Sequence, residues 1–356
     1  MSIETAETPS PDVGPRQRHI KKRPHWLAWS LGVVILLIVL LAAYYEVESH
    51  AIFSPSSGTA IVTVRSGESA SGVYGAMAAE GIIGSAPMMR LYSAIHGSPT
   101  ILQGSYQMHR GLTFAAAAQD LRAGPNIIPI DVPPGFTVKE IVNRIAAYGA
   151  NTVADQMMTS MKSGAVRSPF EPASTNNLEG LIAPGQYLIT PASTGSQVLT
   201  QMVSRFVALA ARNGLYPTSR LNGLDAYQLV IASSIVEKEG YYQVNMPKVA
   251  RVIYNRLAIG MPLQMDSTIL YALGRDGGKV TASDLAVSSP YNTYLTHGLP
   301  PTPTCVPSAL AIRAVSNAPA GPWLYFVLIN KAGVEAFSTT YAQQVANEAI
   351  ARAAGV

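Results

Sequence analysis

An uncharged run of 20 residues, from Trp26 to Tyr45, constrains the fold of this 356-residue chain more than any other feature. At 1.5 Å per residue, a helix of this length crosses a hydrocarbon core of about 30 Å. Arginines and lysines precede the run, and Glu46 and Glu48 follow it. The positive-inside rule therefore places the N-terminus in the cytoplasm and the rest of the chain on the other side of the membrane. A cleaved signal peptide normally has a shorter apolar region that ends at small residues, so we predict a retained single-pass anchor.

The composition excludes several classes of function. Charged residues make up 13% of the chain and the net charge is only +4. No basic stripe follows the N-terminal cluster, so we expect no nucleic-acid partner. The single cysteine, Cys305, cannot form an intrachain disulfide, and we expect it to be a buried small residue. The six histidines are scattered without a metal-binding spacing, so we expect neither a metal nor another cofactor.

Periodicity and composition indicate an α+β protein. It would combine the N-terminal transmembrane helix, a small α/β module and a mixed, mainly helical domain. The predicted segments are a cytoplasmic tail (1–25), the transmembrane helix (26–45), a linker (46–59), the α/β module (60–125), a connecting region (126–215) and the final domain (216–356). Residues 150–175 have no pattern that predicts a structure.

The α/β module has the pattern strand, helix, helix, strand and helix. We expect the strands at 60–64 and 102–108, a helix from Ser66 or Ser69, and two more helices at 85–95 and 113–122. The order resembles a LysM-like module, a small glycan-binding fold. Downstream, the connecting region predicts a strand at 126–132 and helices at 138–148 and 194–213.

An acidic pair lies at the end of a strongly apolar helix in the final domain. Asp225 and Gln228 form a capping-box start, and apolar or small residues then cover every face, so the helix is expected to be buried. Glu237 and Glu239 follow where this helix leaves the core, and burial raises the pKa of a carboxyl, as a proton donor near neutral pH requires. The two lie about 200° apart around the helix, so they cannot act as a pair on one face. Helical geometry alone does not decide which one matters.

Four polar motifs follow this helix within about sixty residues. They are Asn255-Arg-Leu, Leu263-Gln-Met-Asp-Ser-Thr268, Tyr291-Asn-Thr-Tyr294 and Gly298-Leu-Pro-Pro301. Together with Leu178-Glu-Gly and Ile231-Ala-Ser-Ser-Ile-Val-Glu-Lys-Glu, they resemble the catalytic block of the MltG-type endolytic murein transglycosylases, the YceG-like family. The resemblance covers about residues 60–350 and is most specific between Ile231 and Pro301, so the final domain is expected to be a YceG-like catalytic domain.

The resemblance implies a reaction and a compartment. The first Glu of the Glu-Lys-Glu motif is the family's catalytic residue, and Glu237 occupies that position. It would protonate a glycosidic oxygen of nascent peptidoglycan and then take the proton from the muramic acid C6 hydroxyl, which leaves a 1,6-anhydromuramyl end. This reaction needs no second carboxylate. The resemblance further implies inner-membrane anchoring, a periplasmic catalytic domain, a role in terminating strand elongation, and peptidoglycan synthases as partners.

Side chains of the polar motifs are candidates for substrate binding, because amides suit N-acetyl groups and aromatic rings suit sugar faces. They are Asn292, Gln264, Tyr294, Asp266, Thr268 and Tyr291. Glu179 either lines the cleft or has a structural role such as a surface pair, and we favour the structural role. Asn255 and Arg256 either hold the catalytic helix or touch substrate.

The chain departs from the family pattern at three places. Thr302-Pro-Thr-Cys305 stands where the family usually has Gly-Pro-Ile, and Glu335 and Gln344 stand where members often carry His. Two alternative functions stay open. Ser234 and Lys238, four residues apart on one helical face, could form an acyl-transfer pair. The chain could also be a membrane-tethered glycan-binding scaffold without catalysis.

Overall fold

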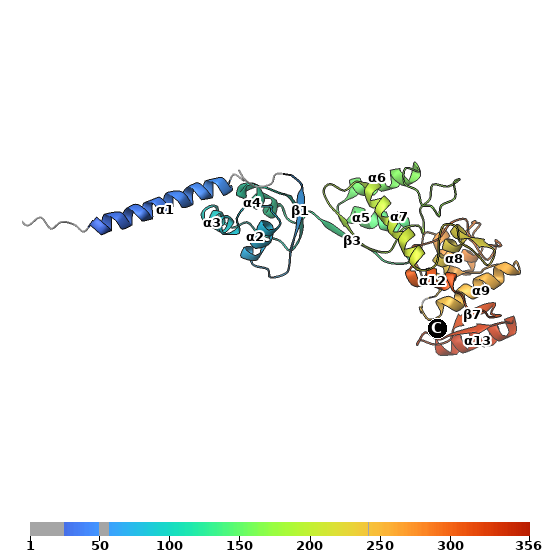
Figure 1. Cartoon of the computed structure of the whole chain (residues 1–356). Helices are drawn as coiled ribbons and strands as arrows, with labels where there is room; N and C mark the ends of the chain where they lie inside the picture. The colour runs from blue at the N-terminus through green and yellow to red at the C-terminus, as the bar shows by residue number, and fades with distance from the viewer. Residues whose placement is uncertain (1–24, 50–56, 241) are drawn as a thin grey trace, which may run out of the picture. The chain divides into compact units, whose positions relative to one another are not determined.

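The computed structural model describes residues 25–49, 57–240 and 242–356 (Figure 1). The predicted cytoplasmic tail lies almost wholly outside these residues, as does the middle of the predicted linker. The chain divides into two compact units, one built from residues 1–103 and 108–124 and the other from residues 104–107 and 125–356.

Helix α1 (His25–Ser49) contains the predicted apolar run. Its segment Trp29–Val47 has a mean hydropathy of 2.3. Every residue from Trp29 to Tyr44 is exposed, whereas the half-buried Tyr45 packs against Phe114. Among the described residues, this is the one helix long and apolar enough to cross a membrane. A long apolar helix exposed over most of its length suits a lipid environment.

The first unit continues with a small α/β module. Its elements are β1 (Thr59–Val64), α2 (Ala70–Ala79), α3 (Ala86–His96), β2 (Gly104–His109), whose first residues belong to the other unit, and α4 (Phe114–Ala123). The predicted order of strands and helices is thus confirmed. Ser69, Ser85 and Thr113 cap the helices with their hydroxyls. The likeness to a LysM fold stays a prediction.

The second unit begins with a two-stranded antiparallel sheet and three helices. They are β3 (Ile128–Val132), α5 (Val138–Ala147), α6 (Asn151–Lys162), β4 (Gly185–Ile189) and α7 (Gly195–Arg212). Helix α6 fills the segment in which the sequence showed no pattern. It buries Val153, Ala154 and Met157 and packs on both α5 and α7. The contact with α7 is so close that a Cβ at Gly195 would lie 2.4 Å from the Val153 carbonyl oxygen.

The rest of this unit surrounds a central helix, α8 (Ala226–Glu239), which packs against α9 (Met246–Ala258) and α12 (Ala309–Ser316). The remaining elements are the short strands β5 (Arg220–Leu221) and β6 (Leu224–Asp225), helices α10 (Asp266–Ala272) and α11 (Ala282–Leu285), the hairpin of β7 (Tyr325–Leu328) and β8 (Glu335–Ser338), and α13 (Tyr341–Ala354). One hydrophobic core runs from Ile130 through α8 to Val315. The predicted connecting region and the predicted final domain therefore share a core.

Candidate active site

Local sequence signals set both ends of α8. At its start, Asp225 and Gln228 form the predicted capping box, with reciprocal hydrogen bonds of 2.9 Å between side chain and backbone. Every residue from Leu229 to Val236 is buried. At its end, Gly240 lies so close to α9 that a Cβ there would be 2.5 Å from Met246 Cγ. The carboxylates of Glu237 and Glu239 therefore project from a rigid helix terminus.

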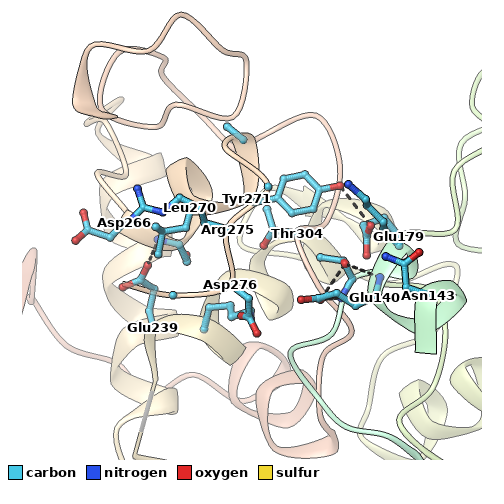
Figure 2. Close-up of a pocket in the computed structure, with 17 residues that line it drawn as sticks. Glu140, Asn143, Glu179, Glu239, Asp266, Leu270, Tyr271, Arg275, Asp276 and Thr304 are labelled. Atoms are coloured by element: carbon cyan, nitrogen blue, oxygen red, sulfur yellow. Dashed lines mark hydrogen bonds and ion pairs between the residues drawn. The ribbon is translucent and has the colours of Figure 1, made fainter. Parts of the chain in front are cut away.

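A cavity of about 690 Å³ opens beside this terminus (Figure 2). The first turn of α5, the end of α8, helix α10 and the loop at 274–277 contribute its walls. Its charged lining residues are Lys139, Glu140, Glu179, Lys238, Glu239, Asp266, Arg275 and Asp276. The cavity thus gathers carboxyl groups from four separate segments of the chain.

Glu239 lines this cavity and has the properties of a proton donor. Its Oε1 accepts a hydrogen bond of 3.0 Å from the backbone N–H of Ser267. Burial raises the pKa of Glu239 more than the bonds to Ser267 lower it, and the nearby charge of Asp266 raises it further. A carboxyl in this environment keeps its proton to a higher pH than an exposed glutamate.

Glu237 is placed differently. It is partly buried, and its Oε2 accepts a hydrogen bond of 2.8 Å from the backbone N–H of Ser308, the N-cap residue of α12. It is not among the residues that line the cavity. A carboxylate at a helix N-terminus is favourable because the first N–H groups lack intrahelical partners. The visible role of Glu237 is therefore to join α8 to α12.

Glu179 lies in the lining of the cavity and is only 5% exposed. Its Oε1 accepts a bond of 3.0 Å from the N–H of Val138, the first residue of α5, and its Oε2 accepts one of 3.3 Å from the Tyr271 hydroxyl. Burial raises the pKa of Glu179 to about 7, although both bonds act in the opposite direction. Glu179 thus has a structural role and lines the cavity at the same time. From the sequence, these two roles were alternatives.

Of the six predicted substrate-binding residues, Asp266 lines the cavity. The hydroxyl of Tyr294 donates to Asp266 Oδ1 over 2.6 Å, so Tyr294 holds a lining residue but does not itself line the cavity. Gln264 is exposed and has a φ of 50°, and its N–H donates to the carbonyl of Thr293. Tyr291 bonds Thr302 through its hydroxyl at 2.8 Å, and its ring centroid is 4.9 Å from that of Tyr271.

The other two predicted residues, Asn292 and Thr268, are fully buried and hold the loop around them. Asn292 donates from Nδ2 to the carbonyls of Leu285 and Val287, and its Oδ1 accepts from the N–H of Tyr294. The hydroxyl of Thr268 donates to the Met265 carbonyl over 2.7 Å. The hydrogen-bonding groups that suggested sugar binding in these two residues are therefore occupied within the protein.

Asn255 and Arg256, for which two roles stayed open, both bind backbone carbonyls. Asn255 Nδ2 donates to Gly321 and Trp323, and the buried Arg256 donates to Leu263 and Leu324. Both therefore tie α9 to the segment before β7.

The Ser-Lys alternative receives no support from the geometry. The hydroxyl of Ser234 is fully buried and donates to the Ile231 carbonyl over 2.8 Å. Lys238 Nζ forms an ion pair of 2.6 Å with Asp276 at the cavity. Within the described part of the chain, no group of three His, Cys, Asp or Glu side chains is arranged to hold a metal ion.

Of the two departures near the C-terminus, Gln344 takes a structural position. Gln344 is buried, and it donates to the Phe326 carbonyl and accepts from the Ser338 hydroxyl. Burial raises the pKa of Glu335 to about 7, against the effect of a hydrogen bond with Asn245.

Several lining residues were not candidates from the sequence, among them Tyr271, Arg275 and Asp276. Tyr271 lies on the short helix α10, directly after a predicted binding motif. Arg275 and Asp276 belong to the segment Gly274-Arg-Asp-Gly-Gly278, in which all three glycines have positive φ. A polar, glycine-rich loop next to a predicted binding motif is the signal that could have identified the last two.

Comparisons with known proteins agree on one family. The YceG-like family model matches residues 62–350. A protein of Bacillus subtilis (strain 168) named endolytic murein transglycosylase is 26% identical over 288 residues, which are 76% of this chain and 79% of that protein. A protein of the same name from Streptococcus pneumoniae (strain ATCC BAA-255 / R6) is 26% identical over 278 residues, 69% of this chain but 50% of its own length. A crystal structure of a yceG-like protein from Listeria monocytogenes covers 81% of this chain and 98% of its own, with a TM-score of 0.55 and 26% identity.

Proposed function

The chain belongs to the YceG-like family, and on that premise we propose that it is a lytic transglycosylase that cleaves peptidoglycan glycan strands internally. The names of the relatives from B. subtilis and S. pneumoniae support this assignment. The observation that carries it in this chain is Glu239, a partly buried carboxyl of raised pKa at the wall of a large cavity.

We propose Glu239, and not Glu237, as the acid of the reaction. An acid must reach the glycosidic oxygen within hydrogen-bond distance, so it must face the substrate. Glu239 lines the cavity, whereas the carboxylate of Glu237 is bound to the N–H of Ser308 outside the lining. The resemblance of the sequence assigned this role to Glu237, so the two variants must be compared directly.

The reaction that we propose uses Glu239 twice. Its protonated carboxyl donates the proton to the glycosidic oxygen, and the bond between that oxygen and C1 of the muramic acid breaks with its electron pair on the oxygen. The C6 hydroxyl of the same muramic acid then forms a bond to C1 and gives its proton to the Glu239 carboxylate. The products are a 1,6-anhydromuramyl end and a free sugar hydroxyl, and no water is consumed. One carboxyl of raised pKa is sufficient for both transfers.

We further propose that α1 anchors the protein in the inner membrane as a single span. Its N-terminus would lie in the cytoplasm and its catalytic domain in the periplasm. The apolar segment Trp29–Val47, exposed from Trp29 to Tyr44, and the basic residues that precede it support this topology. In that compartment the substrate would be newly made glycan strands. Cleavage there would terminate strand elongation, and peptidoglycan synthases are the partners that this role suggests.

The test is to digest purified peptidoglycan with the full chain in a non-ionic detergent and to identify the new ends by mass spectrometry. We expect anhydromuramyl ends from the wild type and from Glu237→Gln, and none from Glu239→Gln. New reducing ends would indicate a hydrolase. No cleavage by a wild type that still binds the glycan would support the scaffold alternative. Loss of anhydro ends in Glu237→Gln with retention in Glu239→Gln would return the assignment to Glu237.

A further inference from the structure

We propose that Tyr271 is a sugar-binding residue of the cavity that Glu239 lines, and that Glu179 is the positioning residue that holds it there. The proposal rests on the proposed function, because it takes the glycan strand as the ligand. It assigns the substrate contact to an aromatic residue outside the motifs that predicted sugar binding.

The position of Tyr271 is the first argument. It belongs to α10 and lines the cavity, and its ring remains partly exposed. Figure 2 shows Tyr271 and Glu179 together, well separated in this view from Glu239 and Asp266. A glycan strand in the cavity would thus reach the acid beside the start of α10 and an aromatic ring further along the same helix. Aromatic rings suit the apolar C–H faces of sugars, while their hydroxyls bind polar partners.

The second argument is the way in which this ring is held. Its hydroxyl donates to Glu179 Oε2 over 3.3 Å, and its ring lies at a centroid distance of 4.9 Å from that of Tyr291. Tyr291 is held in turn by its hydroxyl bond of 2.8 Å to Thr302. Contacts from the hydroxyl and from one side of the ring restrict the rotamers of Tyr271. A restricted ring loses less conformational entropy when a ligand binds it.

Glu179 itself is held by the start of another helix. Its Oε1 accepts a hydrogen bond from the N–H of Val138. This N–H is in the first turn of α5, where the donors have no partner inside the helix. The charged and titratable groups that act on it are Glu140 from α5, Tyr271 from α10, Tyr227 from α8 and Cys305 from the loop before α12. The residue after it, Gly180, has a φ of 71°, and a Cβ there would lie 2.3 Å from Pro303 Cβ. This backbone leaves the Glu179 side chain little freedom to move.

Glutamine at position 179 is the informative substitution. It has the shape of glutamate but only one acceptor oxygen; with that oxygen on the N–H of Val138, its NH2 group faces the Tyr271 hydroxyl and cannot accept a hydrogen bond from it. The change therefore replaces the bond that Tyr271 donates to a carboxyl with, at most, a bond that it accepts from a neutral amide, and it opens no cavity. Tyr271→Phe removes the same hydroxyl bond from the other side, and Tyr271→Ala removes the ring.

The experiment measures binding separately from cleavage. The full chain carrying Glu239→Gln, in detergent, is titrated with glycan strands freed of their peptides by an amidase, and Kd is measured by calorimetry. In this background, we expect Tyr271→Ala to raise Kd about tenfold, as the loss of an aromatic contact would. Tyr271→Phe and Glu179→Gln should each raise Kd by a smaller and similar factor, and the double variant should match either single one.

The control is Tyr148→Ala, which removes a tyrosine that is 59% exposed and does not line the cavity. It should bind like the background protein, and circular dichroism should show the same helix content in all variants. An unchanged Kd in a folded Tyr271→Ala protein would overturn the proposal, as would additive effects of Glu179→Gln and Tyr271→Phe. Binding without any cleavage by the wild type would refute the proposed activity and leave the sugar-binding role of Tyr271 standing.

Discussion

Glu237 and Glu239 lie two residues apart at the end of α8, yet their carboxylates bind different segments of the protein. Glu237 accepts a hydrogen bond of 2.8 Å from Ser308 N–H at the start of α12, and Glu239 accepts one of 3.0 Å from Ser267 N–H in α10. The period of the helix separates two such positions by about 200°. One carboxylate therefore joins helices while the other faces the cavity.

The first prediction compares these two carboxyls. Glu239→Gln should lower kcat by about 10²- to 10⁴-fold, the usual contribution of general acid catalysis. Glu237→Gln should change kcat by no more than a few-fold but should lower the free energy of unfolding by about 1 kcal/mol, because a charge is lost from the N-terminus of α12. Release of anhydromuramyl products and urea unfolding measure the two effects. Equal loss of activity in both variants would contradict the division of roles.

The second prediction concerns the pH dependence of cleavage. Glu239 must be protonated to donate, and burial raises its pKa above the ordinary value for glutamate. Activity should therefore be present below that raised pKa and should fall as the pH rises through it. The pH profile of kcat/KM for the wild type reports this value for the free enzyme. A rate that increased steadily with pH across the same range would exclude Glu239 as the acid.

The third prediction concerns stability and Glu179. Burial raises its pKa from 4.5 to about 7, so between these values the folded state binds more protons than the unfolded state. The free energy of unfolding should therefore fall by about 3 kcal/mol as the pH rises through this range. Glu179→Gln should make the pH dependence shallower by this amount. Glu348→Gln, which alters a partly exposed carboxyl on α13, should leave it unchanged.

The fourth prediction tests the backbone next to Glu179. Gly180→Ala would bring a Cβ to 2.3 Å from Pro303 Cβ at a residue with a φ of 71°. It should cost about 3 kcal/mol, from the left-handed backbone and from the steric overlap together. Gly223→Ala has a φ of 80° but open space around the new Cβ, so it should cost only about 1 kcal/mol. Urea unfolding measures the free energy of unfolding of both variants. Equal losses of this free energy would contradict the prediction, because they would mean that the overlap with Pro303 adds no cost.

The fifth prediction concerns α1. The full chain should remain with membranes through a carbonate wash, and deletion of residues 25–49 should release it, because Trp29–Val47 is the one described segment apolar enough to span. The N-terminal sequence of the protein recovered from membranes provides the control. A mature chain that began after residue 49 would show that the apolar run is a cleaved signal.

Elements with strong local signals could be predicted from the sequence. The capping box of Asp225 and Gln228 and the unbroken apolar character of the next residues predicted α8 and its burial. Helix α6 could not be predicted, because its N-cap residue Ala150 makes no side-chain hydrogen bond, and it is held by packing on α5 and α7. Tertiary contacts supply the stability that its local signals lack.

The candidate site was predicted only in part. Asn292 has the side chain that suits an N-acetyl group, but its amide is occupied by the carbonyls of Leu285 and Val287. A sequence shows which groups a side chain carries, not whether another part of the protein has already bound them. The same reason explains why the polar character of Thr268 indicated binding, although it is fully buried.

The sequence by itself determined the apolar N-terminal helix, the buried helix with an acidic end, and the resemblance to one family, because each depends on neighbouring residues or on their spacing. The tertiary structure decided which carboxyl of that acidic end faces the cavity. It also brought Glu179 to Tyr271 across 92 positions of the chain. Such a pairing depends on where the tertiary structure places α10 relative to the loop that carries Glu179, and no local pattern encodes it.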